Sequence, residues 1–348
     1  MGDGGRVSVN RSMKKIVLVG GIILSIEIKP FESKFFNDLV DLAMETYNTE
    51  KMKTPALLGD IDKKYFYKNL QNLIVHGTVN IAVENGDIIG YLGFDKDKSS
   101  IAKSATSPLF GYGVRYSNRG NVIGQLFQKT AAVLCESYVN DLWVNVYAHD
   151  SDILWMYIMS AFSMDVTDVV RDTGVPVQFK PVAYVFREID KSTLMNYKHE
   201  VIELYRELIN HLRVSPVFYH CKYFMPIENR FEDFLSDNIR VFSVFDGNIL
   251  IGMVSAEYPD RGFAIEDSNA MSLGDLFVAP SYRGQGIASA LLNYANSELK
   301  KEGTRRIFVT HGTINPNARG FWDKYFSNYS YTMNRKIDPD MLGVLQSV

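Results

Sequence analysis

The chain has 348 residues, which is enough for about two domains. Its formal net charge of −3 excludes the strongly basic surface of nucleic-acid-binding proteins. Apolar residues make up 46% of the sequence, including 21 Phe and 20 Tyr, so folded cores are expected rather than disorder. Two cysteines, Cys135 and Cys221, are too few for a disulfide framework or a zinc site, which predicts a reduced, cytoplasmic setting.

Residues 1–24 are expected to be a leader outside the fold. Basic residues precede the apolar run 16–24, an arrangement similar to a secretory signal. That run is too short to span a bilayer, and no small-x-small cleavage site follows it. We therefore expect no membrane attachment. The leader is either disordered or precedes the true start, and the fold begins near Leu24.

The first half of the chain alternates strand and helix patterns from Ile26 onward. Apolar periodicity predicts strands at 26–29, 79–84, 88–94, 109–116 and 142–147, and helices at 35–48, 62–76, 122–139 and 151–162. Asn85-Gly86 joins two of these strands and is typical of a two-residue hairpin turn.

The second half repeats this order. It predicts strands at 183–189, 240–245, 249–258, 272–278, 306–310 and 329–336, and helices at 198–212, 229–237, 286–302 and 316–326. Asp246-Gly247 supplies the matching hairpin turn. An internal repeat of roughly 155 residues is indicated, with domains at 25–180 and 181–348. Because no Pro/Gly/Ser-rich linker separates them, we expect the halves to pack closely and to share a sheet edge.

The segment 282–288 is the strongest functional signal. It joins a strand to a helix N-terminus, where unpaired N–H groups and the helix dipole favour an anion. Gly284 and Gly286 permit close backbone approach, and Arg283 adds a cation suited to phosphate. A Walker loop is absent. Ser289 replaces the third glycine of a dinucleotide fingerprint, so a diphosphate cradle of another kind is predicted, with an ordinary surface turn as the alternative.

Residues 272–288 resemble motif A of the GNAT N-acetyltransferase superfamily, in which [Q/R]-x-x-G-x-[G/A] is matched by Arg283, Gly286 and Ala288. The segment 315–322 is similar to the family's N-x-x-A-x-x-[FL]-Y helix, and the resemblance covers residues 182–337. It implies that acetyl-CoA is bound through its pyrophosphate by the turn, and through its pantetheine arm by the preceding strand and the later asparagine. The cofactor-binding residues so implied are Phe277, Val278, Arg283, Gly284, Gln285, Gly286, Ile287, Ala288 and Asn315.

The resemblance also implies a fold and an activity. Each half should be an α/β (α+β) GNAT-like domain, with a mixed, mostly antiparallel sheet flanked by helices. The second should transfer acetyl groups to an amine by direct attack in a ternary complex, without a metal. The first is expected to be a degenerate copy, because Val122 stands where Gly286 does, although Tyr157 keeps the family's tyrosine position.

The acceptor is expected to be a small-molecule or peptide amine, and the protein a monomer or homodimer. The identity of the acceptor amine stays open. Tyr219, Tyr223 and Phe224 are candidates to line its pocket or to pack in the core. A CoA-binding sensor or scaffold without turnover is the alternative function, and nucleotide binding is a third.

Catalysis needs a base, because an ordinary ammonium has a pKa near 10. Asp275 and Glu257 are the candidates, since Gly274 stands where some family members place a glutamate. His311 is a candidate proton shuttle or capping residue. For the acid, Trp322 replaces the family's tyrosine, so either Tyr325 substitutes or the thiolate leaves unassisted.

Overall fold

The structure is a computed structural model that describes residues 16–19, 22–59, 61–96, 103–115, 117–214, 216–219, 226–260 and 262–338. Within the predicted leader, β1 (Ile16–Val19) pairs antiparallel with β2 (Ile22–Ser25). The rest of that leader, together with Cys221, Tyr223 and Phe224, lies outside the described residues. Cys135 is buried.

The first half carries the predicted alternation of strands and helices. Its strands are β3 (Glu27–Pro30), β4 (Gly77–Glu84), β5 (Asp87–Lys96), β6 (Ser104–Ser107), β7 (Tyr112–Val114), β8 (Asp141–Tyr147) and β9 (Ser163–Asp172). Its helices are η1 (Ser33–Phe35), α1 (Phe36–Lys53), α2 (Lys63–His76), α3 (Arg119–Glu136) and α4 (Ser151–Met159). The predicted strand 109–116 is wrong in extent, because only its centre pairs with β5. β9 was not predicted.

The second half follows the same order. Its strands are β10 (Val185–Ile189), β11 (Ile239–Asp246), β12 (Ile249–Glu257), β13 (Ala270–Val278), β14 (Arg306–Gly312) and β15 (Ser327–Lys336). Its helices are α5 (Lys191–Asn196), α6 (Lys198–Arg213), α7 (Ile227–Phe234), η3 (Gly262–Glu266), η4 (Pro280–Tyr282), α8 (Ile287–Lys301) and α9 (Pro316–Trp322). Both hairpins form, with Asn85, Gly86 and Gly247 in the left-handed region. The second turn lies one residue later than predicted, at Gly247-Asn248, because Asp246 is paired with Ile249.

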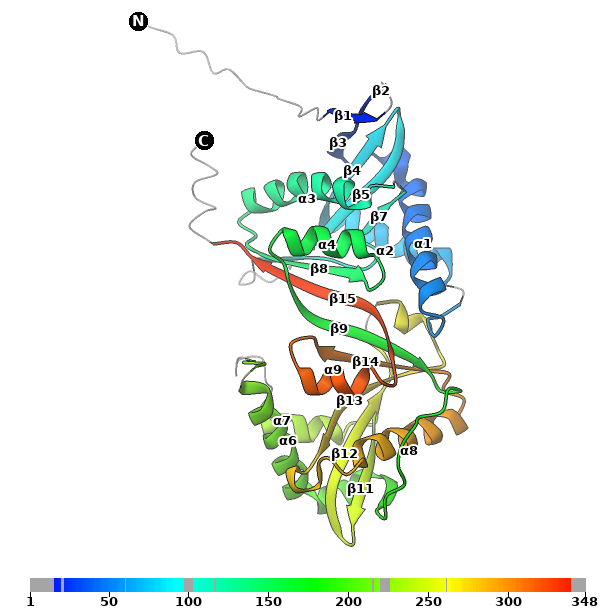
Figure 1. Cartoon of the computed structure of the whole chain (residues 1–348), viewed down its shortest axis with the longest axis vertical. Helices are drawn as coiled ribbons and strands as arrows, with labels where there is room; N and C mark the ends of the chain where they lie inside the picture. Colours follow the sequence, from blue (N-terminus) through cyan, green and yellow to red (C-terminus); the bar gives the residue numbers. More distant parts are fainter. Residues whose placement is uncertain are drawn as a thin grey trace, which may run out of the picture.

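One mixed sheet runs through both halves. Its strand order is β10-β11-β12-β13-β14-β9-β15-β8-β6-β5-β4-β3, with β7 paired to β5 off this path. The last strand of each half lies against the other half, because β9 pairs with β14 and β15 pairs with β8. Figure 1 shows these two strands crossing the middle of the elongated molecule. The α/β (α+β) class and the mixed, mostly antiparallel sheet are confirmed, and the halves exchange strands rather than merely sharing an edge.

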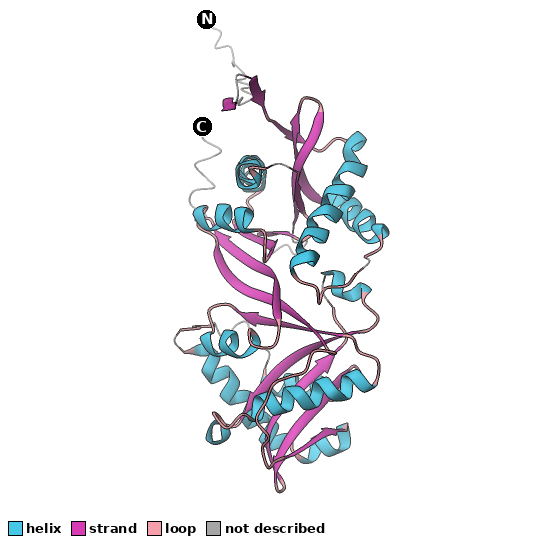
Figure 2. Ribbon diagram, turned by 45° about the vertical axis from the view of Figure 1, so that its right-hand side comes forward, coloured by secondary structure: helices cyan, strands magenta, loops and turns pink. Residues whose placement is uncertain are grey.

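Helices cover both faces of the second-half sheet (Figure 2). Alternation along β11 sends Val241 and Phe245 toward α6 and α7, and Phe242 and Val244 toward α8. The two resulting cores hold the sheet rigidly between helix layers. In the described part of the chain, no helix is long and apolar enough to cross a membrane.

Candidate functional site

β13 and β14 diverge halfway along their length. Their parallel pairing runs from Ala270 opposite Arg306 to Leu273 opposite Val309. Beyond this point β14 remains paired to β9 on its other side, while β13 remains paired to β12. The second half of β13 therefore presents an edge without a strand partner in the described residues. An edge of this kind offers backbone N–H and C=O groups to an extended ligand.

A β-bulge lies where the two strands begin to diverge. Val254 faces Leu276 and Ala256 faces Leu273, so Ser255 stands opposite two residues of β13. One of the two is Gly274, and a Cβ built there would lie 2.5 Å from Ser255 Oγ. A larger residue at position 274 would require the Ser255 side chain to move, so the present packing favours glycine over glutamate here.

The amide directions along β13 follow from one hydrogen bond. Ala279 N–H donates to the carbonyl of Ile251, in β12, at 2.8 Å. Because N–H groups alternate along a strand, the amide of Phe277 also faces β12, whereas those of Leu276 and Val278 face the open edge. Leu276 was not identified from the sequence. It could have been identified by counting back from the end of the strand, because backbone N–H groups point alternately to its two sides.

Arg283 is tied to the end of β13. Its Nε donates to the carbonyl oxygen of Val278 at 2.9 Å. The carbonyl is thereby satisfied at the open edge, and the exposed guanidinium is held beside the turn that follows. Arg283 is therefore both a cation near the predicted cradle and a bond that fixes the strand to the turn.

The turn before α8 has the properties of an anion site. Gly284 and Gly286 have φ of 78° and 84°, which favours glycine, and nothing lies within 4 Å of a Cβ built on either. The first helical hydrogen bond comes from Ala290 N–H to Gly286 O at 3.1 Å. Among the described residues, the amides of 284–289 have no hydrogen-bond partner. These amides, including those of Ile287 and Ala288, are available to a phosphate group.

Two side chains of the turn, those of Tyr282 and Gln285, are hydrogen-bonded to neighbouring elements. The hydroxyl of Tyr184 donates to Gln285 Oε1 at 2.9 Å, and that of Tyr282 donates to Asp246 Oδ2 at 3.0 Å. The Tyr184 and Tyr282 rings meet edge to face at 5.9 Å. β10 and the β11–β12 hairpin thus fix the turn from outside, so Gln285 offers its backbone rather than its side chain.

The helix after β14 begins at the predicted asparagine. Asn315 is its N-cap, and its Oδ1 accepts hydrogen bonds from the amides of Asn317 and Ala318 at 3.1 and 3.3 Å. Trp322 is buried and packs on Phe326. It therefore serves the core beneath α9.

Tyr325 is engaged away from the open edge. Its hydroxyl lies 2.7 Å from Ser289 Oγ, in the first turn of α8, and donates to the carbonyl of Gln178 at 3.2 Å. Both contacts fasten the segment after α9 to its surroundings. A general-acid role for Tyr325 stays a prediction, and it would require these contacts to break.

The two candidate bases differ in their partners. Asp275 Oδ2 accepts from Arg230 Nε at 2.8 Å and Nη2 at 2.7 Å, and this guanidinium also lies over the ring of Phe234. Glu257 has no hydrogen bond or ion pair from its carboxylate within the described residues. Burial raises the pKa of Glu257 above its ordinary value. Of the two, Glu257 is the carboxylate that is free to accept a proton.

His311 is buried beneath α9. Its Nδ1 lies 3.4 Å from the carbonyl of Gly312, its Nε2 has no hydrogen-bond partner among the described residues, and Asp323 is 3.9 Å away. Burial lowers the pKa of His311 below 6.5, because the charged form is disfavoured there. It makes no cap of α9, which Asn315 provides.

The first half lacks the turn. α3 begins at Arg119, one helical turn earlier after its strand than α8 does, so residues 119–122 are helical where 283–286 form the cradle. Val122 is fully buried, as is Tyr157. The Arg119 guanidinium is paired with Asp150, the N-cap of α4. At the start of α3, the amides of Asn121 and Val122 donate to the side chain and the carbonyl of Asn118, each at 3.3 Å, so these two are already occupied.

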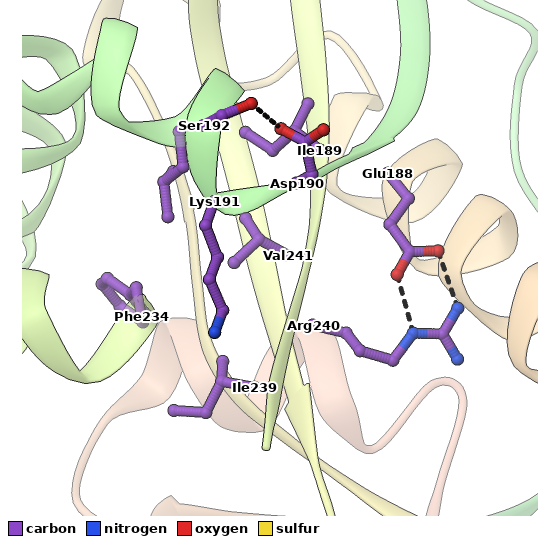
Figure 3. Close-up of a pocket in the computed structure, with 10 residues that line it drawn as sticks. Glu188, Ile189, Asp190, Lys191, Ser192, Phe234, Ile239, Arg240 and Val241 are labelled. Carbon is purple, nitrogen blue, oxygen red and sulfur yellow. Dashed lines mark hydrogen bonds and ion pairs between the residues drawn. The ribbon is translucent and has the colours of Figure 1, made fainter. Parts of the chain in front are cut away.

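Figure 3 shows a surface hollow of about 450 Å³ between β10, α5 and β11. Its charged groups have partners. Glu188 pairs with Arg240 at 2.7 Å, Lys191 with Asp237, and Asp190 caps α5 through the amide of Thr193. With its charges satisfied internally, the hollow brings no reactive group together.

No curated protein matches the sequence. The crystal structure of a GCN5-related N-acetyltransferase from Sphaerobacter thermophilus is similar, with a TM-score of 0.53 and 13% identity over 89% of this chain and 95% of that chain. A tandem GNAT protein from the clavulanic acid biosynthesis pathway aligns with a TM-score of 0.43 and 15% identity, over 89% and 98% of the two chains.

The model of the acetyltransferase (GNAT) family matches residues 204–327. This segment contains the diverging strands, the bulge, the glycine turn and the N-cap of α9. Residues 204–327, in the second half of the chain, are thus similar to a domain of the GNAT acetyltransferase family.

Proposed function

We propose that the second half transfers an acetyl group from acetyl-CoA to a primary amine. The row of unpartnered amides at 284–289 carries this proposal, because it fits a diphosphate and directly follows the open edge of β13. The pantetheine arm would extend along that edge. The N–H groups of Leu276 and Val278 point the right way to bind the thioester oxygen as charge develops on it.

The reaction balances without a further reactant. The substrate ammonium gives a proton to Glu257, and its nitrogen then forms a bond to the acetyl carbonyl carbon. The carbon–sulfur bond breaks, the nitrogen gives up its second proton, and the thiolate, whose ordinary thiol pKa is near 8.5, leaves and takes up that proton through solvent, so that the proton held by Glu257 is the net one released. Asp275 holds the guanidinium of Arg230 in place and thereby shapes one side of the site.

The cradle is tested by adding a single Cβ to it. Gly286→Ala should weaken acetyl-CoA binding about tenfold or more in calorimetry, because the methyl group points into the space where the phosphates approach. Gly303→Ala is the matched control, since Gly303 has φ of 92° and open space around it, at the other end of α8. It carries similar backbone strain and should bind acetyl-CoA normally.

Equal affinity of Gly286→Ala and the wild type would overturn the cradle. Turnover is measured separately, by thiol release in the presence of a panel of amines. Binding of acetyl-CoA without turnover of any amine would instead support a CoA-binding sensor.

A further inference from the structure

A cavity of about 480 Å³ lies on the sheet where the two halves meet. Its floor is formed by β6, β8, β15 and β9, and its walls by α2 and the η3 segment. Aromatic side chains dominate the lining, namely Tyr65, Phe66, Phe110, Trp143, Tyr147, Tyr219, Phe263 and Tyr329. In size and character it matches the pockets that hold small organic ligands.

Two carboxylates also line this cavity, and among the residues that the structure describes no Lys, Arg or His does. Asp165 has no hydrogen bond or ion pair from its side chain within the described residues. Asp168 accepts only hydroxyl hydrogen bonds, from Thr310 at 2.5 Å and Ser330 at 2.7 Å. Partly buried carboxylates without a cation partner are rare in proteins, and here they face a cavity walled by aromatic rings.

Two β-bulges shape the cavity floor. In the β9–β15 ladder, Met164 faces Met333 and Val166 faces Thr332, which leaves Asp165 as an extra residue. Asp168 faces Ser330 and Val169 faces Asn328, which leaves Tyr329 as another. Bulges redirect side chains and occur beside active sites. Here each bulge places one lining residue, a carboxylate in one strand and an aromatic ring in the other.

The cavity is joined to the acetyl site through β14. Thr310, which holds Asp168, is the first residue of β14 beyond its last pair with β13. Thr313 donates from both its N–H and its hydroxyl to the carbonyl of Asp165 at 3.0 Å. Asn315, the cap of α9, follows directly. The carboxylate of Asp168 and the backbone of Asp165 are therefore fixed to the segment that forms one side of the open edge.

We propose that this cavity binds the acyl acceptor, and that the acceptor is a primary amine carried on an aromatic body. The inference rests on the proposed acetyl transfer. The carboxylates attract the ammonium, the rings stack on the body and stabilise the cation, and Asp168 directs the nitrogen toward β13. Both halves line the cavity, which gives the first half a role in acceptor recognition although it lacks an anion turn.

Binding of the acceptor is tested without turnover. Tyramine should quench the fluorescence of Trp143, whereas 2-(4-hydroxyphenyl)ethanol, which lacks the charge, and n-butylamine, which lacks the ring, should bind about tenfold more weakly or less. Asp165→Asn should weaken tyramine binding about tenfold, and because its side chain has no partner to lose, the fold should be unaffected. Asp87→Asn, at an exposed hairpin end, removes the same charge and should change nothing.

Steady-state kinetics then separate this proposal from the one on which it rests. Asp165→Asn and Asp168→Asn should raise KM for tyramine while leaving the affinity for acetyl-CoA unchanged. Unchanged KM values in an enzyme that binds acetyl-CoA and acetylates amines would overturn the cavity assignment alone. Tyramine binding that depends on Asp165, in a protein that does not bind acetyl-CoA, would support the cavity and overturn the acetyl transfer.

Discussion

In the first half of the chain, Arg119 and Asp150 form an ion pair at positions equivalent to Arg283 and Asn315 in the second. Arg119 Nη2 and Nε lie 2.6 and 3.2 Å from the two carboxylate oxygens. Both arginines also donate to the carbonyl at the end of their preceding strand. An asparagine carries no charge to neutralise the arginine. Because aspartate in the first half is replaced by asparagine in the second, the charge of Arg119 is neutralised, whereas Arg283 stays available to an anion.

Removing that pair should destabilise the protein without creating a second cofactor site. Asp150→Asn should lower the free energy of unfolding by about 1–3 kcal/mol in urea denaturation, because Arg119 is left with a weaker partner in a partly buried place. Glu45→Gln breaks the exposed pair with Arg115 and should cost less than about 1 kcal/mol. We expect no second cofactor site because α3 begins one helical turn earlier than α8 and occupies the place of the cradle. A second equivalent of bound acetyl-CoA in Asp150→Asn would contradict this explanation.

The bulge in β13 should show coupling between two residues. Gly274→Ala should destabilise the protein by about 1–3 kcal/mol, because its Cβ would overlap Ser255 Oγ. Adding Ser255→Ala should recover part of that loss, since the Ser255 Cβ is 3.8 Å away. Thermal or urea denaturation of the four proteins in the cycle measures this. Strictly additive effects would mean that the glycine is required for another reason.

The pH dependence of turnover should identify the base. Glu257 must be ionised to accept a proton, and burial raises its pKa, so kcat/KM should fall as the pH drops through that raised value. Glu257→Gln should lower kcat and abolish this acidic limb. Asp275→Asn, which removes the partner of Arg230, should keep the limb. If the limb disappears in Asp275→Asn and survives in Glu257→Gln, the two roles are reversed.

His311 should make the fold sensitive to mild acid. Its pKa is lowered in the folded state, so its neutral form stabilises the protein fully above about pH 6.5, the unfolded value. That contribution is lost as the pH falls toward the folded value, because the unfolded chain is protonated first. His311→Gln should therefore flatten the decline of Tm below pH 6.5. His76→Gln, at the exposed end of α2, should leave the curve as it is in the wild type.

Local patterns were sufficient for much of the fold and for the turn. The hairpins predicted from Asn85-Gly86 and Asp246-Gly247 depend on residues adjacent in sequence, and both form. The unpaired amides before α8 follow from two glycines and a helix start. The family resemblance added what they would bind, and the matched segment 204–327 agrees with it.

Long-range relationships were not accessible in this way. β9 was missed because Ser163–Asp172 mixes charged and apolar residues and gains its place only from β14 and β15. Asp275 is paired with Arg230, which is distant in sequence. This pairing is what favours Glu257 over Asp275 as the base, and the sequence did not show it. The cavity carboxylates depend on a bulge in the β9–β15 ladder, a register feature that no single strand encodes.

The exchange of β9 and β15 has a consequence for biosynthesis. While the ribosome is still making the second half, the edges of β8 and β9 have no β15 to pair with, since Ser327–Lys336 follows them in the chain by more than 150 residues. Uncovered strand edges invite association with other chains. The nascent polypeptide thus stays vulnerable until β15 has been made, and a truncation before residue 327 would leave both halves open at their centre.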